Sequence, residues 1–254
     1  MNGLLDNLRV VLVGTRNPLN LGAAARAMSN FGVAHLRVVN PYEVAFREAR
    51  SAVGAAELLG RAEEYASVAE AVADCRLVVG TTAAGRRELQ QELCRLEEGA
   101  RKIRKKLGSG LVALLFGSEK VGLSNQDLSH CHWLMRIPTR EEHGSMNLGQ
   151  AVAVCLYELA RTKGIASGKK PRADEELRAR TGDAERLTRL LFEVLRASGY
   201  VKPRVGVATE EKLRRMVRRL NLSVADAELW LGILRQIAWK VDASEEKSSL
   251  KRSL

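Results

Sequence analysis

The sequence predicts an α/β domain with a mostly parallel sheet, followed by an all-helical C-terminal extension. Over residues 1–165, short β-branched apolar runs alternate with segments of helical periodicity, the pattern of parallel strands joined by crossover helices. Residues 166–180 are rich in Gly, Ser, Lys and Pro and are predicted to form a linker. Residues 181–242 contain amphipathic helices without a strand, and residues 243–254 are predicted to be a flexible tail.

Each predicted strand is short, apolar and continuous, as strands buried on both faces of a sheet are. The strands are expected at residues 8–14, 35–40, 76–81, 111–117 and 133–138. The helices of the first domain are expected from an N-cap at Asn20 onward and over residues 43–63, 68–73, 92–107 and 146–162. Those of the extension are expected over residues 184–200, 209–221 and 223–241, with caps at Thr209 and Ser223.

The composition is that of an ordinary globular protein. Hydrophobic residues make up 46% and charged residues 28% of the 254 residues, and no apolar run approaches the ~18 residues of a membrane span. The N-terminus lacks the features of a signal peptide, so a cytoplasmic location without membrane attachment is expected. Four widely spaced cysteines without a CxxC pair predict reduced, mostly buried thiols and no metal site. They are Cys75, Cys94, Cys131 and Cys155.

The net charge of +11 favours a polyanionic partner, and nucleic acid is the leading candidate. Residues 161–220 hold seventeen Lys and Arg against eight Asp and Glu, an excess of nine. A solvated basic helix face is the alternative interpretation of the segment LRRMVRRL. The residues predicted to contact RNA are Arg86, Arg87, Lys105, Lys106, Arg214, Arg215 and Arg218.

Four predicted loops should meet at one edge of the sheet. In an open parallel sheet, ligands bind in the crevice beyond the carboxyl ends of the strands. The loops that end there are rich in Gly, Ser, Thr, Asn or Pro, and they are TRNPLN, GTTAAGRR, FGSEKVGLSN and IPTREEHGSMN. The sequence therefore predicts a ligand pocket at this edge.

The helix that starts NLGAAARAM carries a single arginine, Arg26. Arg26 lies over the nearly bare positions Gly22 and Ala23, away from the apolar stripe that packs on the sheet. Because helical side chains lean toward the N-terminus, the guanidinium is predicted to reach the crevice beside Asn20. An arginine that simply faces water is the alternative.

Two further loops carry candidate polar groups. Glu119 follows the most apolar predicted strand, where its carboxylate could orient a partner such as Arg26, although a surface acid is the simpler alternative. Ser145 and Asn147 enter the next helix, where they could serve only as caps. They also add hydroxyl and amide groups to the same crevice, more than one cap requires.

Three segments together resemble, in order and spacing, the motifs of the SpoU/TrmH branch of the SPOUT methyltransferases. NLGAAARAM resembles the first motif, LLFGSEKVGLSN the second and IPTREEHGSMNLGQAVAV the third. The chain length and the C-terminal helices are most similar to the TrmJ-type enzymes of that branch. The resemblance implies S-adenosylmethionine as methyl donor, a homodimer and a trefoil knot. It also implies methylation of a ribose 2′-hydroxyl in tRNA, at cytidine or uridine 32 of the anticodon loop.

The resemblance also implies roles for individual residues. The positions that match the catalytic residues are Asn20, Arg26, Glu119, Ser145 and Asn147. The positions that match the donor-binding loops are Thr81, Thr82, Ala83, Gly117, Ile137, Ser145, Met146 and Asn147. Two positions depart from the pattern, since Met146 replaces a leucine and Ala84 stands where TrmJ-like sequences often have an arginine. A non-catalytic RNA-binding regulatory protein and an rRNA 2′-O-methyltransferase are the alternative functions.

Overall fold

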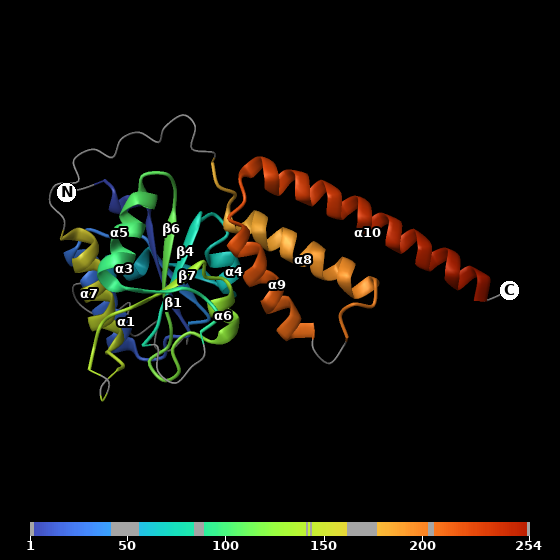
Figure 1. Ribbon diagram of the computed structural model, residues 1–254. Coiled ribbons are helices and arrows are strands. Elements are labelled where there is room, and N and C mark those ends of the chain that lie inside the picture. Colours follow the sequence, from blue (N-terminus) through green and yellow to red (C-terminus); the bar gives the residue numbers. More distant parts are fainter. Residues whose placement is uncertain are drawn as a thin grey trace. The chain divides into compact units, whose positions relative to one another are not determined.

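The computed structural model of the chain describes residues 3–41, 56–83, 89–140, 142, 144–161, 177–202 and 206–252, with side chains described through residue 241 (Figure 1). The chain divides into two compact units, residues 1–175 and 176–254, so the division falls within the predicted linker. Each unit is described by itself.

The first unit is built around a seven-stranded sheet in which every pair of neighbouring strands is parallel (Figure 1). The strands are β1 (Leu8–Val13), β2 (Leu36–Val39), β3 (Glu63–Tyr65), β4 (Leu77–Thr81), β5 (Leu93–Arg95), β6 (Val112–Phe116) and β7 (Trp133–Arg136). Their order across the sheet is β3-β2-β1-β6-β4-β7-β5. The predicted α/β class and parallel sheet are thus confirmed.

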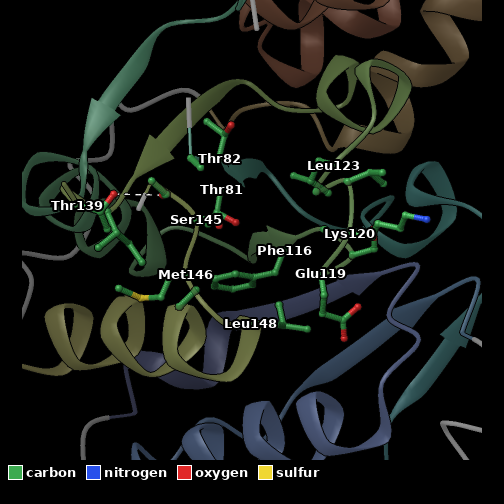
Figure 2. A pocket seen from close by; sticks show the side chains of 18 of the residues that line it. Thr81, Thr82, Phe116, Glu119, Lys120, Leu123, Thr139, Ser145, Met146 and Leu148 are labelled. Atoms are coloured by element: carbon green, nitrogen blue, oxygen red, sulfur yellow. Dashed lines mark hydrogen bonds between the residues drawn. The ribbon is translucent and has the colours of Figure 1, made fainter. Parts of the chain in front are cut away.

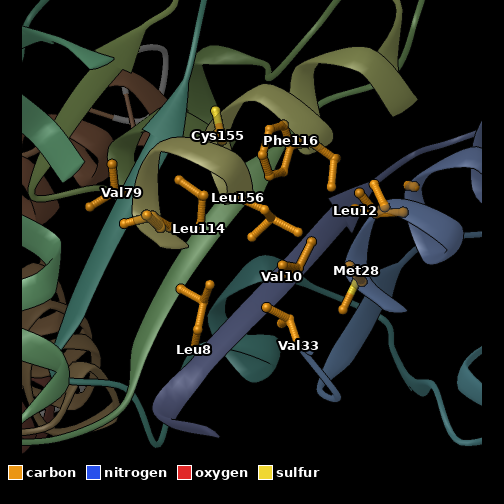
Figure 3. Close-up of a cluster of buried hydrophobic side chains, with 14 of the residues drawn as sticks. Leu8, Val10, Leu12, Met28, Val33, Val79, Leu114, Phe116, Cys155 and Leu156 are labelled. Atoms are coloured by element: carbon orange, nitrogen blue, oxygen red, sulfur yellow. The ribbon is translucent and has the colours of Figure 1, made fainter. Parts of the chain in front are cut away.

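Helices cover both faces of this sheet. They are η1 (Leu5–Asn7, a 3-10 helix), α1 (Pro18–Asn30), α3 (Ala56–Gly60), α4 (Val68–Ala71), α5 (Leu96–Leu107), α6 (Asn125–Ser129) and α7 (Leu148–Ala160). Apolar residues of α1, α5 and α7 form one hydrophobic cluster with the sheet, in which Leu8, Val10 and Leu12 alternate along β1 (Figure 3). Residues of α4 and α6 form a second cluster on the opposite face.

Helices α1 and α7 pack against each other closely enough to bring their first turns together. A Cβ atom placed on Gly149 would lie 2.5 Å from the Cβ of Ala23, so only glycine fits at that point of contact. Asn20 in the first turn of α1 therefore meets Asn147 at the start of α7, and their side chains are hydrogen bonded. This packing joins two of the three predicted motifs.

Two elements of the sheet differ from the sequence prediction. The predicted helix 92–107 begins only at Leu96, because Leu93–Arg95 pairs with β7 as an edge strand. Of the predicted helix 43–63, residues 56–60 are helical as α3, but its last residue, Glu63, begins β3, which pairs with β2. Residues 42–55 lie outside the described residues. The predicted loop FGSEKVGLSN ends at the start of a short helix that was not predicted, α6, which Ser124 and Asp127 cap reciprocally.

The second unit is helical, as predicted. It consists of α8 (Thr181–Ala197), α9 (Gly206–Leu220) and α10 (Val224–Arg252) around a small apolar cluster that includes Leu187, Val217, Leu231 and Leu234. Ser223 caps α10 as predicted, since its hydroxyl oxygen accepts a hydrogen bond from the Asp226 amide at 3.1 Å. Thr209 is not a cap, because α9 already begins at Gly206, and the predicted tail is helical through Arg252. None of the helices in the described ranges is both long and apolar enough to span a lipid bilayer.

Candidate active site

A pocket of about 460 Å³ opens beyond the carboxyl ends of β4, β6 and β7 (Figure 2). This is the edge at which the sequence predicts a ligand site, and the volume lies in the range typical of small-molecule pockets. Phe116 lies at its centre, with Leu148 and Met146 beside it (Figure 2). The full lining is Thr81, Thr82, Ala83, Phe116, Gly117, Ser118, Glu119, Lys120, Val121, Gly122, Leu123, Met135, Ile137, Thr139, Gly144, Ser145, Met146, Leu148 and Ala151.

Hydrogen bonds to backbone carbonyl oxygens hold two of the loops that form the pocket. The Thr81 hydroxyl donates to the Leu115 carbonyl oxygen at 2.8 Å, and the Thr82 amide donates to the Met135 carbonyl oxygen at 3.0 Å. The loop after β7 is closed by the Thr139 hydroxyl, which donates to the Gly144 carbonyl oxygen at 3.1 Å. These bonds fix the loops after β4 and β7 before any ligand arrives, which reduces the entropic cost of binding.

The loop after β6 folds back on itself beside the pocket. The Gly122 amide donates to the Ser118 carbonyl oxygen at 2.8 Å, and Gly122 has a φ of +70°, in the left-handed region that favours glycine. A Cβ atom on Gly117 would lie 2.0 Å from the carbonyl carbon of Gly122. Glycine at both positions therefore permits the turn that presents Glu119 and Lys120 at the pocket rim.

A chain of hydrogen bonds connects three of the predicted catalytic residues. The Asn147 amide nitrogen Nδ2 donates to Asn20 Oδ1 at 2.8 Å, and Asn20 Nδ2 donates to Glu119 Oε1 at 2.9 Å. Glu119 Oε2 also accepts from the Arg16 backbone amide at 3.5 Å, a long bond. Asn20 is 9% exposed, whereas Glu119 and Asn147 are exposed. A buried amide thus ties the loop after β6 to the start of α7.

Asn20 occupies this position because α1 starts earlier than predicted. Asn17 is the N-cap, since its side-chain oxygen accepts from the Leu19 amide at 2.9 Å, and Pro18 is the first helical residue. The prediction that Asn20 caps the helix is therefore wrong. Asn20 lies inside the first turn, and its side chain is free to bridge Glu119 and Asn147.

Arg26 is not brought to the pocket. Its side chain is exposed, it is absent from the pocket lining, and no described residue forms an ion pair with it. Among the described residues the structure records no hydrogen bond between Arg26 and Asn20, so the position of Arg26 beside Asn20 stays a prediction. Glu119 bonds Asn20 in the place where the sequence suggested that it could orient Arg26.

Most of the predicted donor-binding positions do line the pocket. Thr81, Thr82, Ala83, Gly117, Ile137, Ser145 and Met146 are all in the lining, and Asn147 lies behind it in the hydrogen-bonded chain. The sequence prediction did not include several residues, of which Phe116, Met135 and Leu148 are buried and supply apolar surface. Their positions, at strand ends and at the first residue of a helix, were the signal that could have identified them.

The predicted RNA-binding residues differ in accessibility. Lys105 and Lys106 are exposed in the last turn of α5, whereas Arg86 and Arg87 lie outside the described residues. The side chains of Arg214 and Arg218 are only 7% and 3% exposed, so we remove them from the predicted RNA-binding set.

Buried ion pairs explain why these two arginines are inaccessible. Arg214 donates to both carboxylate oxygens of Glu185, with Nε–Oε2 at 2.9 Å and Nη2–Oε1 at 3.0 Å. Arg218 donates from Nη1 to the Thr181 carbonyl oxygen at 3.0 Å. Arg215 is half-buried and lies 3.5 Å from a carboxylate oxygen of Glu211. These bonds join α8 and α9, so this part of the basic segment stabilises the helical unit.

The cysteine side chains are buried and hold no metal-binding arrangement that is free for an ion among the described residues. All four cysteines are free and buried, as predicted. Among the described residues, one group could hold a metal ion by its spacing, Glu92, Cys94 and Glu98. The Lys102 ammonium already lies 2.7 Å from Glu92 Oε1 and 3.0 Å from Glu98 Oε1, so a lysine takes the place that a cation would occupy.

Comparison with known proteins gives a family match that includes all three motif segments. Residues 7–157 match the SpoU rRNA Methylase family. The chain is 34% identical over 237 residues to the tRNA (cytidine/uridine-2′-O-)-methyltransferase TrmJ of Pectobacterium atrosepticum, which covers 92% of this chain and 98% of that protein. It is 34% identical over 238 residues to TrmJ of Escherichia coli strain K12, with 92% and 96% covered.

Solved structures show the same likeness in three dimensions. The crystal structure of TrmJ from Z. mobilis ZM4 superposes with a TM-score of 0.79 at 29% sequence identity. The match covers 90% of this chain and 98% of that one, so both the sheet and helices of the C-terminal unit have counterparts.

Proposed function

Because the chain belongs to the SpoU rRNA Methylase family, we propose that it transfers a methyl group from S-adenosylmethionine to a ribose 2′-hydroxyl of tRNA. The tRNA substrate is supported by the curated relatives of similar length, which are named tRNA (cytidine/uridine-2′-O-)-methyltransferases. The pocket formed by the loops after β4, β6 and β7 is the observation that carries the proposal. Modification of cytidine or uridine 32, a homodimer and a trefoil knot belong to the same proposal.

The residues of the pocket fit an adenosyl group. Phe116, Met135 and Leu148 supply apolar surface for a planar base, and the backbone of Thr81–Ala83 and Ser145–Met146 supplies polar groups at the rim. The polar chain Asn147–Asn20–Glu119 lies beside that rim and is positioned to hold the loops on which donor and acceptor meet.

The reaction is a displacement at carbon. S-adenosylmethionine supplies a methyl carbon bound to a positively charged sulfur. The ribose oxygen forms the new bond to that carbon as the carbon–sulfur bond breaks, and the hydroxyl proton leaves to a phosphate oxygen or water. Catalysis therefore depends on alignment of oxygen, carbon and sulfur, which fixed loops provide. Because Arg26 lies outside the pocket lining of its own chain, we propose that it reaches the ribose oxygen from the partner protomer of the proposed homodimer. There it stabilises the developing negative charge, since arginine stays protonated and donates up to five hydrogen bonds.

A mapping experiment tests this proposal. Unmodified tRNA is incubated with the protein and S-adenosylmethionine, and the methylated nucleotide is located by mass spectrometry. The expected product is a 2′-O-methylated pyrimidine at position 32. A parallel reaction with rRNA tests the rRNA alternative that the family description suggests. Binding of tRNA without any methyl transfer would instead support the non-catalytic alternative.

The Arg26→Ala variant tests the role of this residue. We expect methyl transfer to fall at least 100-fold, because the transition state loses a charge-stabilising donor, while donor affinity stays within about twofold. Donor affinity is measured by calorimetry and methyl transfer with a labelled donor. Wild-type turnover by Arg26→Ala would remove Arg26 from the chemistry.

A further inference from the structure

Two arginines lie side by side at the carboxyl ends of the edge strand β5 and its neighbour β7. The strands pair in parallel with Arg95 directly opposite Arg136. The preceding partners Cys94 and Met135 belong to one hydrophobic cluster, and Leu93 and Leu134 pack into the other. Because side chains alternate along a strand, both arginines emerge on the face of Leu93 and Leu134, and neighbouring strands are about 4.8 Å apart.

This positive charge is poorly compensated. Like charges directly opposite each other destabilise a sheet. Arg95 Nε lies 3.7 Å from Glu97 Oε2, but these side chains are 62% and 54% exposed, so the ion pair contributes little. Arg136 is exposed, and the structure records no ion pair or side-chain hydrogen bond for it among the described residues. An anion bound between the two guanidinium groups would relieve their repulsion.

The arginine pair borders the pocket. Arg136 lies in the chain between Met135 and Ile137, which both line the pocket, so its Cα is about 3.8 Å from each of theirs. Lys105 and Lys106 lie far from the pocket. Helix α5 starts directly after Arg95 and runs for twelve residues, about 18 Å, toward the amino ends of the strands, where β6 begins. The two lysines at the end of α5 are therefore not neighbours of the pocket.

We propose that Arg95 and Arg136 form a binding site for a backbone phosphate of the RNA substrate, next to the nucleotide that receives the methyl group. This inference rests on the proposed function. Guanidinium groups bind phosphate with paired, charge-assisted hydrogen bonds, and two of them can hold one phosphate from two sides. The site fixes the substrate beside the donor pocket, so its effect falls on RNA binding and not on donor binding.

The test compares three double variants of the full-length protein. Arg95→Gln/Arg136→Gln removes both charges and Arg95→Lys/Arg136→Lys keeps them. The control Arg61→Gln/Arg101→Gln removes two charges from exposed arginines that lie outside the lining of the pocket. For each, tRNA binding is measured between 50 and 200 mM salt (roughly the range over which phosphate contacts are resolved), together with KM for tRNA, kcat and donor affinity.

We expect KM for tRNA to rise about tenfold in Arg95→Gln/Arg136→Gln, with kcat and donor affinity within about twofold of wild type. The log–log salt slope should fall by about 0.7–0.9, since that is what one neutralised phosphate contributes. The lysine variant should keep most of the wild-type slope, and the control should change KM less than threefold.

Several results would overturn the inference. One is a salt slope and KM in Arg95→Gln/Arg136→Gln that equal those of the control. Another is a loss of donor affinity without a loss of tRNA affinity, which would assign the pair to the carboxylate of the donor. If wild type binds tRNA through these arginines but transfers no methyl group, the proposed function fails while the phosphate site stands.

Discussion

At the scale of single residues, two glycines in the first unit should respond oppositely to the same substitution. Gly117→Ala places a Cβ atom 2.0 Å from the Gly122 carbonyl carbon, so the turn that holds Glu119 must move. We expect a loss of about 3 kcal/mol in unfolding free energy, the upper end of overpacking costs, and loss of donor binding. Gly22→Ala in α1 meets no atom within 4 Å and should stabilise the protein by about 0.5–1 kcal/mol.

Denaturant unfolding and donor calorimetry check both glycine variants. Because Gly22 lies in the same unit as Gly117, Gly22→Ala controls for a general effect of alanine. A Gly117→Ala protein with wild-type stability and donor affinity would show that the turn after β6 does not need the close approach seen in the structure.

The helix start at Asn17 shows why part of the site could be predicted and part could not. Asn20, Glu119 and Asn147 were identified as polar residues of one crevice, and the structure joins them by hydrogen bonds. The position of Arg26 depended on where α1 begins. With Asn17 as cap, Arg26 lies in the third turn of α1 and not in the second, and its exposed side chain is not part of the pocket lining. Pro18 was the overlooked signal.

At the scale of elements, a buried arginine joins β2 to the end of α4. Arg37 is 4% exposed and donates to both carboxylate oxygens of Asp74, at 2.6 and 2.7 Å, and to the Ala71 carbonyl oxygen at 2.7 Å. The hydrogen bonds from Arg37 lower the pKa of Asp74 below its ordinary value. A lowered carboxyl pKa stabilises the fold above the unfolded-state pKa of about 4, and this contribution is lost as pH falls through the lower folded-state pKa.

Asp74→Asn should therefore destabilise the protein in a pH-dependent way. We expect a loss of about 2 kcal/mol at pH 7, less than for a fully buried ion pair because the Asp74 side chain is 41% exposed. The difference from wild type should shrink as pH falls below about 4. Urea unfolding from pH 7 to pH 3 measures it, with Glu70→Gln, an exposed carboxylate of α4, as control. A difference that stays constant over this range would contradict the prediction.

The short edge strands show the limit of periodicity. Long apolar strands such as β1 and β6 were predicted within one or two residues, because buried parallel strands are continuous apolar runs. β5 has only three residues and its extended state depends on pairing with β7, where the Leu134 amide donates to the Glu92 carbonyl oxygen at 2.8 Å. A local pattern cannot reveal a partner about forty residues away along the chain, so the segment was predicted as helix.

At the scale of the whole molecule, the net charge of +11 predicts salt-dependent RNA binding, but burial decides which arginines contribute. The basic segment of α9 has two kinds of residue. Arg214 is buried and paired with Glu185, whereas Lys212 and Arg219 are exposed. The sequence shows the charges but not their burial, because the pairing carboxylate of Glu185 lies on another helix.

Substitution of exposed and of buried cations in α9 should therefore have different effects. Lys212→Gln/Arg219→Gln should leave the unfolding free energy within about 0.5 kcal/mol of wild type, as surface changes do, and should lower tRNA affinity and its salt slope. Arg214→Gln leaves the carboxylate of Glu185 without its main partner and should destabilise the helical unit by about 3–5 kcal/mol. Its tRNA affinity per folded molecule should stay close to that of wild type at low temperature, because a buried guanidinium contacts no phosphate. Circular dichroism on heating and tRNA titrations in salt separate the two effects. A stable Arg214→Gln protein with weakened tRNA binding would show that this arginine leaves its ion pair to meet RNA.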